Sequence, residues 1–430
     1  MVFEWRDFRL GDLTTWSSGT TPSKQNPSFW GGDIPWISGT VMRSKNLCES
    51  ELYLTQEGLD NKGKLCKKNS VLLLVRGDLF NRIPISIATK SLSFNQDIKA
   101  INSVSDDLLQ HYIYYLLEGN KKRLSNIVEF TGLGAGKLDT KLLQDLTFKI
   151  PSIDYQESLI NFFTSIDSKI ELINKNSETL EALAKTLFKS WFIDFDPVRA
   201  KSQGCSTGLP NGINELFPDS FEESEFGDIP TGWKLGNLDQ IALNPRETAK
   251  PFQMDSSYRY IGLEHMPRES IALSDSGTAE NLASNKNVFK KGDILFGKLR
   301  PYFKKTGCAQ FDGVCSTDIV VVREKFKLCR GFICFLLASN TFIDFTVALS
   351  SGTRMPRTSW NQMCEFLLPI PQLPLVQIFG EVVSPILDKI RINSDQSISL
   401  SSVRNTLLPK LISGELRIPD AEKMLEEVGI

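Results

Sequence analysis

The chain has 430 residues, more than one hydrophobic core usually holds, so its length favours several domains. Apolar residues make up 41% and charged residues 23%, a composition that excludes disordered, collagen-like and fibrous proteins. The net charge is −2, but residues 1–150 carry +3 and residues 231–370 carry +5, whereas residues 151–200 carry −3 and residues 201–230 carry −5. Two basic blocks in a nearly neutral chain favour contact of those blocks with a polyanion.

Cysteine, histidine and apolar patterns exclude several classes. The eight cysteines contain no CxxC pair and the only histidines are His111 and His265, so we expect no bound metal. Acidic residues close to Met1 interrupt any apolar leader, which predicts a cytoplasmic protein without disulfides. The apolar run at 331–349 includes Asn340 and Asp344 and is short for a membrane span, so we expect a core helix there.

The sequence repeats itself at an offset near 220 residues, and the matching segments occur in the same order in both halves. The matches are RLGDL (9–13) with KLGNL (234–238), KKNSVLLLVRG (67–77) with KKGDILFGKLR (290–300), NQDI (95–98) with STDI (316–319), and HYIYYLL (111–117) with GFICFLL (331–337). Ile150-Pro151 and Ile370-Pro371 close the two blocks. We therefore predict an α+β fold with two related domains of strands and short helices, residues 1–151 and 231–371, and an approximate twofold relation between the halves.

After each Ile-Pro pair the pattern becomes that of a long helix, which we predict at residues 152–192 and 372–412. Spacings of three and four residues form a heptad stripe in each helix. The first stripe comprises Phe163, Ile166, Ile170, Ile173, Ser177, Leu180, Ala184, Leu187 and Trp191, and the second comprises Val383, Ile386, Ile390, Asn393, Ser397, Leu400, Arg404, Leu407 and Leu411.

These stripes predict that the helices pack on each other as an antiparallel coiled coil; the alternative is that each helix packs on its own domain. The second stripe is weaker, because Asn393 and Arg404 are polar and Pro385 predicts a late start or a kink. We expect the following residues to make the interhelical packing: Phe163, Ile166, Ile170, Ile173, Leu180, Leu187, Ile386, Ile390, Leu400 and Leu407.

Two segments remain outside the domains and helices. Residues 193–230 cluster Gly, Pro and acidic residues and are interpreted as a linker, and residues 413–430 form a C-terminal tail. The predicted order is therefore domain, spacer helix, linker, domain, spacer helix and tail.

No motif in the chain supports catalysis. Asn26-Pro27-Ser28-Phe29 resembles the tetrad of amino-methyltransferases but lacks its middle proline, and no Gly-rich S-adenosylmethionine loop accompanies it. GLGAGK at 132–137 lacks the spacing of a phosphate loop and is interpreted as a flexible basic loop. Two basic domains held apart by paired helices, without a catalytic site, favour a protein that reads two separate places on DNA.

The chain resembles the specificity subunits of type I restriction-modification systems along nearly its whole length. The resemblance is carried by TPSKQNPSFWGGDIPWIS (21–38), LAKTLFKSWFIDFDPVRAK (183–201), GDILFGKLRPYFKK (292–305) and LLPKLISGELRI (407–418). It implies two target recognition domains, each reading one half of a bipartite, asymmetric site in double-stranded DNA, with the helices as an antiparallel spacer. It also implies assembly with two methyltransferase (modification) subunits and with restriction subunits that act as motor and nuclease.

The resemblance further implies that S-adenosylmethionine, ATP and Mg act on those partners and that this chain binds no cofactor. The alternatives are a self-contained DNA methyltransferase with fused recognition domains, or a coiled-coil scaffold that binds only protein. Basic or amide residues in the expected loops are the candidates for DNA contact. These are Asn95, Gln96 and Lys137 in the first domain and Lys298, Arg300, Lys304, Lys305, Arg354 and Arg357 in the second.

Overall fold

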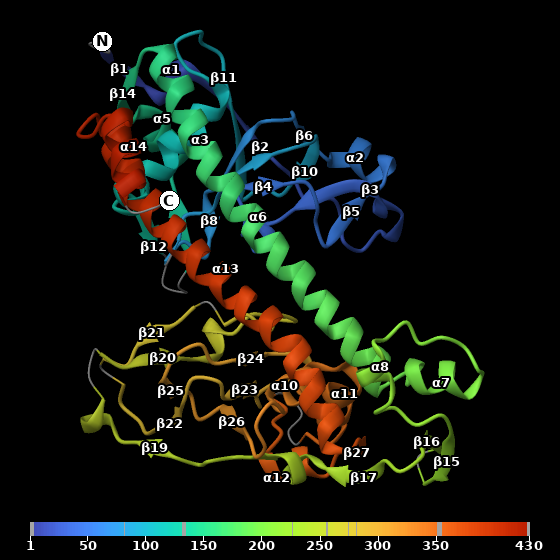
Figure 1. Cartoon of the computed structure of the whole chain (residues 1–430). Helices are drawn as coiled ribbons and strands as arrows, with labels where there is room; N and C mark the ends of the chain where they lie inside the picture. Colours follow the sequence, from blue (N-terminus) through green and yellow to red (C-terminus); the bar gives the residue numbers. More distant parts are fainter. Residues whose placement is uncertain are drawn as a thin grey trace. The chain divides into compact units, whose positions relative to one another are not determined.

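The computed structural model of the chain describes residues 4–80, 82–130, 135–225, 227–254, 257–273, 275–280, 282–350 and 355–427. It divides into two compact units, of which unit 1 comprises Met1–Lys169 with Leu400–Ile430 and unit 2 comprises Ile170–Ser399. Each unit contains one domain of strands and short helices together with a part of each of two long helices (Figure 1).

The domain of unit 1 is built on a five-stranded sheet in the order β2-β11-β7-β9-β4 and a four-stranded sheet in the order β5-β3-β10-β6. Its strands are β1 (Trp5–Arg9), β2 (Thr14–Ser18), β3 (Trp30–Ile37), β4 (Asn46–Leu47), β5 (Leu52–Leu54), β6 (Leu65–Cys66), β7 (Val71–Leu74), β8 (Arg76–Gly77), β9 (Ile85–Ala88), β10 (Leu92–Phe94), β11 (Ile98–Ser103), β12 (Val128–Phe130), β13 (Gly136–Leu138) and β14 (Thr147–Pro151). Its short helices are α1 (Leu10–Leu13), α2 (Gln56–Lys62), α3 (Gln110–Gly119), α4 (Lys121–Ser125) and α5 (Thr140–Asp145).

The domain of unit 2 contains a four-stranded sheet in the order β18-β26-β23-β24 and a five-stranded sheet in the order β19-β22-β25-β20-β21. Its strands are β15 (Phe221–Ser224), β16 (Gly227–Pro230), β17 (Lys234–Asn237), β18 (Ala242–Leu243), β19 (Thr248–Ala249), β20 (Arg259–Ile261), β21 (Gly277–Thr278), β22 (Lys286–Phe289), β23 (Ile294–Gly297), β24 (Thr306–Cys308), β25 (Gly313–Cys315), β26 (Ile319–Glu324) and β27 (Leu367–Ile370). Its short helices are α7 (Asp196–Ser202), α8 (Asn211–Asn214), α9 (Leu238–Ile241), α10 (Arg330–Ala338), α11 (Asn340–Ala348) and α12 (Trp360–Cys364).

The same apolar segments form the core of both domains. The central strands β7 and β23 are buried along their whole length, because a sheet lies around them and a helix covers them. In α3 the six residues 112–117 are buried, and in α10 the seven residues 331–337 are buried. The apolar run at 331–349 therefore begins with a core helix, as the sequence predicted.

No single helix in the described ranges is both long and apolar enough to cross a membrane. The bent pair of α10 and α11 meets that test of length and composition only when the two helices are taken together. Within unit 2, α10 instead supplies Phe332, Phe335 and Leu336 to the hydrophobic core.

One of the repeat matches is displaced by three residues. In unit 1, Arg6 of β1 pairs with Ile150 of β14, and in unit 2, Lys234 of β17 pairs with Ile370 of β27. Because both pairs include the isoleucine of an Ile-Pro end, Arg6 corresponds to Lys234. The prediction that RLGDL (9–13) matches KLGNL (234–238) is therefore wrong in register: LGDL forms helix α1, whereas KLGN forms strand β17.

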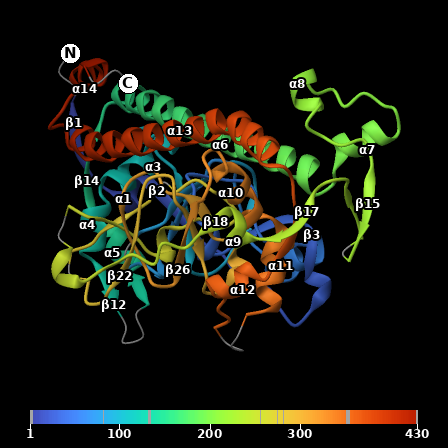
Figure 2. The same ribbon diagram turned by 60° about the horizontal axis from the view of Figure 1, so that its bottom comes forward.

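The segment 193–230, interpreted from its composition as a linker, folds into α7, α8 and the β15–β16 hairpin, which Figure 2 shows beside the end of the first long helix. Val198 and Phe217 of this segment are fully buried in the hydrophobic core of unit 2. Their burial fixes the segment to that core.

The two long helices are α6 (Ile153–Phe192) and α13 (Leu373–Ser413), and α14 (Ile418–Glu427) follows them. Of the residues predicted to pack between the helices, five are buried and five are half-buried. The buried ones are Phe163, Ile166, Ile390, Leu400 and Leu407, and the half-buried ones are Ile170, Ile173, Leu180, Leu187 and Ile386. The helix α13 begins twelve residues before Pro385, so the late start that this proline predicted does not occur.

Within each unit the two helices lie side by side and run in opposite directions (Figure 1, Figure 2). In unit 1, the Tyr155 hydroxyl near the start of α6 donates to the Leu411 carbonyl near the end of α13, at 3.1 Å. In unit 2, Phe192 at the end of α6 packs on Phe379 near the start of α13, with ring centroids 5.0 Å apart. Each unit therefore holds an antiparallel pair of helix segments.

Two polar residues of the second stripe, Asn393 and Arg404, are hydrogen-bonded to the first helix within their own units. Asn393 is buried, and its Nδ2 donates to Ser177 Oγ at 3.1 Å within unit 2. Within unit 1, Arg404 Nη1 donates to Asp167 Oδ1 at 3.0 Å. A buried polar group costs little when it is hydrogen-bonded, so these residues do not break the stripe but fix which residues of the two helices face each other.

Two carboxylates on α6, the half-buried Asp167 and the buried Glu181, each attach the helix to the domain of their own unit. In unit 1, Asp167 Oδ2 accepts from Lys45 Nζ at 2.7 Å and from the Tyr115 hydroxyl at 3.0 Å. In unit 2, Glu181 accepts from Ser270 Oγ at 2.8 Å and from the Ile271 amide at 3.0 Å. Each domain therefore contacts α6 through one carboxylate that accepts hydrogen bonds from specific groups of that domain.

We predict that Asp167→Ala lowers the free energy of unfolding of unit 1 by about 3 kcal/mol, because it leaves the partly buried Lys45 and Arg404 without a counter-charge. Asp167→Asn keeps an acceptor oxygen and is expected to cost less. Thermal unfolding of the full chain measures both effects, and Glu178→Ala, which removes an exposed carboxylate of the same helix, serves as the control. Equal stability of Asp167→Ala and Glu178→Ala would contradict the assignment.

Candidate nucleic-acid interface

Both domains build the same main-chain junction beside the predicted basic loops. In unit 1, the Val75 amide donates to the Asp97 carbonyl at 2.8 Å and the Val75 carbonyl accepts from the Leu138 amide at 2.8 Å. In unit 2, the Lys298 amide donates to the Asp318 carbonyl at 2.9 Å and the Lys298 carbonyl accepts from the Thr358 amide at 3.0 Å. Three segments that are distant in sequence are therefore joined in the same way twice.

The strands that leave this junction also correspond. In unit 1, Arg76 of β8 pairs with Lys137 of β13, and in unit 2, Leu299 forms an isolated bridge with Arg357. Lys137 and Arg357 thus occupy equivalent positions. Gly136 and Lys137, which the sequence assigned to a flexible loop at 132–137, lie in strand β13; residues 132–134 of that loop lie outside the described residues.

The three candidates of the first domain lie close to this junction but differ in exposure. Asn95 is 9% exposed, and its Nδ2 donates to Asp97 Oδ2 at 3.1 Å, so its side chain belongs to the turn. Gln96 is exposed, and its Oε1 accepts from the Thr21 hydroxyl at 2.7 Å. Lys137 is half-buried on β13. Of the three, Gln96 and Lys137 are accessible to a ligand.

Lys298 forms the junction of the second domain, and two further candidates, Arg300 and Arg357, lie beside it. The amide of Arg300 donates to the Pro356 carbonyl at 2.8 Å, and Arg300 adopts a left-handed backbone conformation with φ 53°. The Arg357 side chain is 53% exposed, and its guanidinium lies 3.4 Å from Asp318 Oδ1. Arg354 lies outside the described residues.

Lys304 and Lys305 are engaged within the domain. Lys304 Nζ donates to Glu269 Oε1 at 3.0 Å, and Lys305 Nζ donates to the Leu263 carbonyl. Burial, with a smaller contribution from Arg268, lowers the pKa of Lys305. These lysines are therefore less available to DNA than Lys298 and Arg357.

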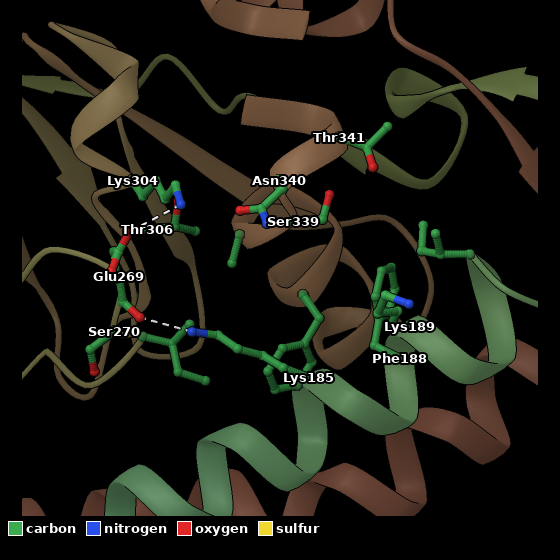
Figure 3. A pocket seen from close by; sticks show the side chains of 14 residues that line it. Lys185, Phe188, Lys189, Glu269, Ser270, Lys304, Thr306, Ser339, Asn340 and Thr341 are labelled. Atoms are coloured by element: carbon green, nitrogen blue, oxygen red, sulfur yellow. Dashed lines mark hydrogen bonds and ion pairs between the residues drawn. The ribbon is translucent and has the colours of Figure 1, made fainter. Parts of the chain in front are cut away.

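Lys304 also lines a cavity of about 380 Å³ that faces α6 within unit 2 (Figure 3). Lys185 of α6 reaches into this cavity and donates to the Glu269 carbonyl at 2.8 Å. Glu269 thus receives hydrogen bonds from both sides of the cavity, which holds the domain against the helix.

A second concave site adjoins the junction of the second domain, with a volume of about 360 Å³. Arg246, Lys298 and three asparagines, Asn244, Asn287 and Asn361, line it. The sequence analysis found Lys298 but missed the other four. The usable signal was the segment Asn244-Pro245-Arg246, a turn sequence that places a basic residue two positions before strand β19.

The comparisons with known proteins agree with this architecture. Residues 3–182 match the sequence model of the family described as the type I restriction modification DNA specificity domain. The chain is 25% identical to the type I restriction enzyme MjaIX specificity subunit of Methanocaldococcus jannaschii, over 97% of this chain and 94% of that protein. It is 24% identical to the HindI specificity subunit of Haemophilus influenzae, over 96% of this chain and 100% of that protein.

A crystal structure of the type I restriction-modification S subunit from M. genitalium shows the same fold, with a TM-score of 0.51 and 15% identity over 95% of this chain and 96% of that chain. Fold and sequence together define a two-domain DNA-specificity protein with two long helices. The family model covers the first domain and most of α6, and the relatives that are similar over nearly the whole chain are specificity subunits of type I restriction-modification systems, so the chain resembles that class of DNA-recognition protein.

Proposed function

We propose that each domain of this chain reads one half of a bipartite, asymmetric DNA site. The observation that carries the proposal is that the two domains share the main-chain junction but differ in the side chains that they present there. Arg76, Gln96 and Lys137 in the first domain correspond to Leu299, Thr317 and Arg357 in the second. Two domains that approach DNA alike but carry different side chains are expected to read different sequences.

On this proposal, residues 1–151 and 231–371 are the target recognition domains. Lys137 and Arg357 bind phosphate and set the register of each domain on the duplex, while Gln96 and Lys298 lie nearer to the bases. The half-buried Lys137 and the exposed Arg357 have long basic side chains that suit phosphate contact, because such contact needs charge and reach rather than exact geometry.

The helices α6 and α13 would set the distance between the half-sites and carry two modification subunits. The acidic sum of residues 151–200 and the exposed outer face of α6 support a protein partner rather than DNA along the helices. The modification subunits would supply S-adenosylmethionine, and restriction subunits would supply the ATP- and Mg-dependent steps. Because its target is cellular DNA, we place the complex in the cytoplasm.

We predict that Lys137→Ala and Arg357→Gln weaken DNA binding by the assembled complex uniformly across sequences. Each change should lower the slope of the logarithm of affinity against the logarithm of salt concentration by about one, as expected for the loss of one phosphate contact. Lys327→Ala, which removes an exposed charge elsewhere in the second domain, is the control. A change in the methylated sequence, with an unaltered salt slope, would assign these residues to base reading instead.

The spacing role is tested by inserting one heptad between Ile173 and Asn174 of α6 and another between Ser397 and Ile398 of α13. Both insertions lie between the Asp167–Arg404 and Ser177–Asn393 contacts, so both polar pairs survive. Seven residues add about 10 Å of helix, or about three base pairs along DNA. The variant should therefore methylate the same two half-sites with a gap about three base pairs longer.

The matched control inserts the heptad in α6 alone. This insertion breaks the hydrogen bond between Ser177 and Asn393 and should lower the yield of assembled complex. The modified adenines of the host genome, mapped by sequencing, report the gap. A paired insertion that leaves the gap unchanged would exclude the helices as the spacing element.

A further inference from the structure

We propose that the cleft lined by Arg246 and Lys298 reads a guanine in the half-site of the second domain. This inference rests on the proposed function, since it assigns one base contact to the domain that the proposal places on DNA. The ligand is a guanine edge in the major groove, and the reading groups are the Arg246 guanidinium and the Lys298 ammonium.

The cleft lies where three elements of unit 2 meet. Asn244 and Arg246 occupy the connection between β18 and β19, Lys298 follows β23, and Asn361 lies on α12. Its volume of about 360 Å³ is open enough for a base edge. Because Lys298 also forms the junction with Asp318 and Thr358, the cleft is built into the rigid part of the domain.

Arg246 is held in a defined orientation. Its φ is 52°, a left-handed conformation that a residue with a side chain adopts at a cost. The Arg246 amide donates to Asn244 Oδ1 at 3.2 Å, and its Nη2 donates to Asn361 Oδ1 at 3.4 Å. These contacts restrain the backbone and one edge of the guanidinium, leaving the remaining N–H groups to bind a ligand.

The charges around the cleft favour a ligand that accepts hydrogen bonds. Within the described ranges, neither Arg246 nor Lys298 forms an ion pair, and no carboxylate lines the cleft. The two acidic residues close by are already engaged, Glu247 with Arg323 at 3.2 Å and Asp318 with Arg357 at 3.4 Å. The positive charge of the cleft is therefore not neutralised by the protein.

Among the four bases, guanine fits this donor set best. Its major-groove edge presents two adjacent acceptors, O6 and N7, which arginine and lysine bind in the commonest specific contact with DNA. Adenine and cytosine present an amino donor at the same edge, which would oppose the two cations. Thymine offers a single acceptor beside a methyl group.

The first domain does not repeat this arrangement. Its counterpart of Lys298 is Val75, which is apolar and buried, as the matching hydrogen bonds establish. The proposed guanine contact therefore belongs to one half-site only. This asymmetry gives the test an internal reference, because the other half-site should not respond.

The experiment compares the complete complex containing the natural chain with complexes containing Arg246→Ala, Lys298→Ala or the control Lys327→Ala. Methylated sites are mapped genome-wide. Arg246→Ala is expected to reduce discrimination at one guanine of one half-site by about 10- to 100-fold and to leave the other half-site and the gap unchanged. Lys327→Ala should leave the whole motif unchanged.

A probe duplex with 7-deazaguanine at that position tests the contact at the level of one atom, since it lacks the N7 acceptor. The natural complex should bind this probe more weakly than the guanine duplex. The Arg246→Ala complex should bind the two duplexes with equal affinity. An equal unfolding temperature of the natural chain and Arg246→Ala would show that the variant is folded. If Arg246→Ala does not fold, the guanine contact is tested with Arg246→Lys and with the binding of the 7-deazaguanine duplex to the natural complex.

Three results would overturn the inference. A second half-site without guanine, or an unchanged motif in Arg246→Ala, would exclude guanine reading. A uniform loss of affinity with a lower salt slope would assign the cleft to a phosphate. A natural complex that methylates no bipartite site would instead refute the proposed function, which makes the two failures distinguishable.

Discussion

The attachment of each domain to its own part of α6 depends on one carboxylate of that helix, the half-buried Asp167 in unit 1 and the buried Glu181 in unit 2. A buried carboxylate must be hydrogen-bonded, because its desolvation otherwise costs more than the fold can supply. Asp167 meets this need with Lys45, Tyr115 and Arg404, and Glu181 meets it with Ser270 and the Ile271 amide. Within its own unit, each domain is therefore held against its part of α6 by defined hydrogen bonds, which specify the contact more strictly than apolar packing alone.

The main-chain junctions around Val75 in the first domain and Lys298 in the second hold the backbone in place independently of the side chains proposed to contact DNA. Their hydrogen bonds join main-chain groups, so the side chains at their edges can differ without disturbing them. The first domain places Arg76 and Lys137 there, and the second places Arg357 beside a cleft with Arg246. One scaffold can therefore present two chemically different surfaces, as an asymmetric target requires.

Much of this architecture follows from patterns in the sequence. Heptad spacing predicts the interhelical residues, which are buried or half-buried in their units, and the repeat identifies the corresponding central strands β7 and β23. Matching residues by identity alone misaligns Arg9–Leu13 with Lys234–Leu238, because strand pairing aligns Arg6 with Lys234. Asn393 and Arg404 look unfavourable in the second stripe because their partners, Ser177 and Asp167, are distant in sequence. Arg246 was missed for the same reason: its cleft forms only when β18, β23 and α12 meet.

The central claim is that two unlike readers act at a fixed separation. Mapping methylated adenines in host DNA, with and without this chain and with intact modification subunits, tests it most directly. The account predicts that the chain directs methylation to sites with two different half-sequences and a constant gap between them. Methylation of a palindrome, or of a single continuous sequence, would contradict it.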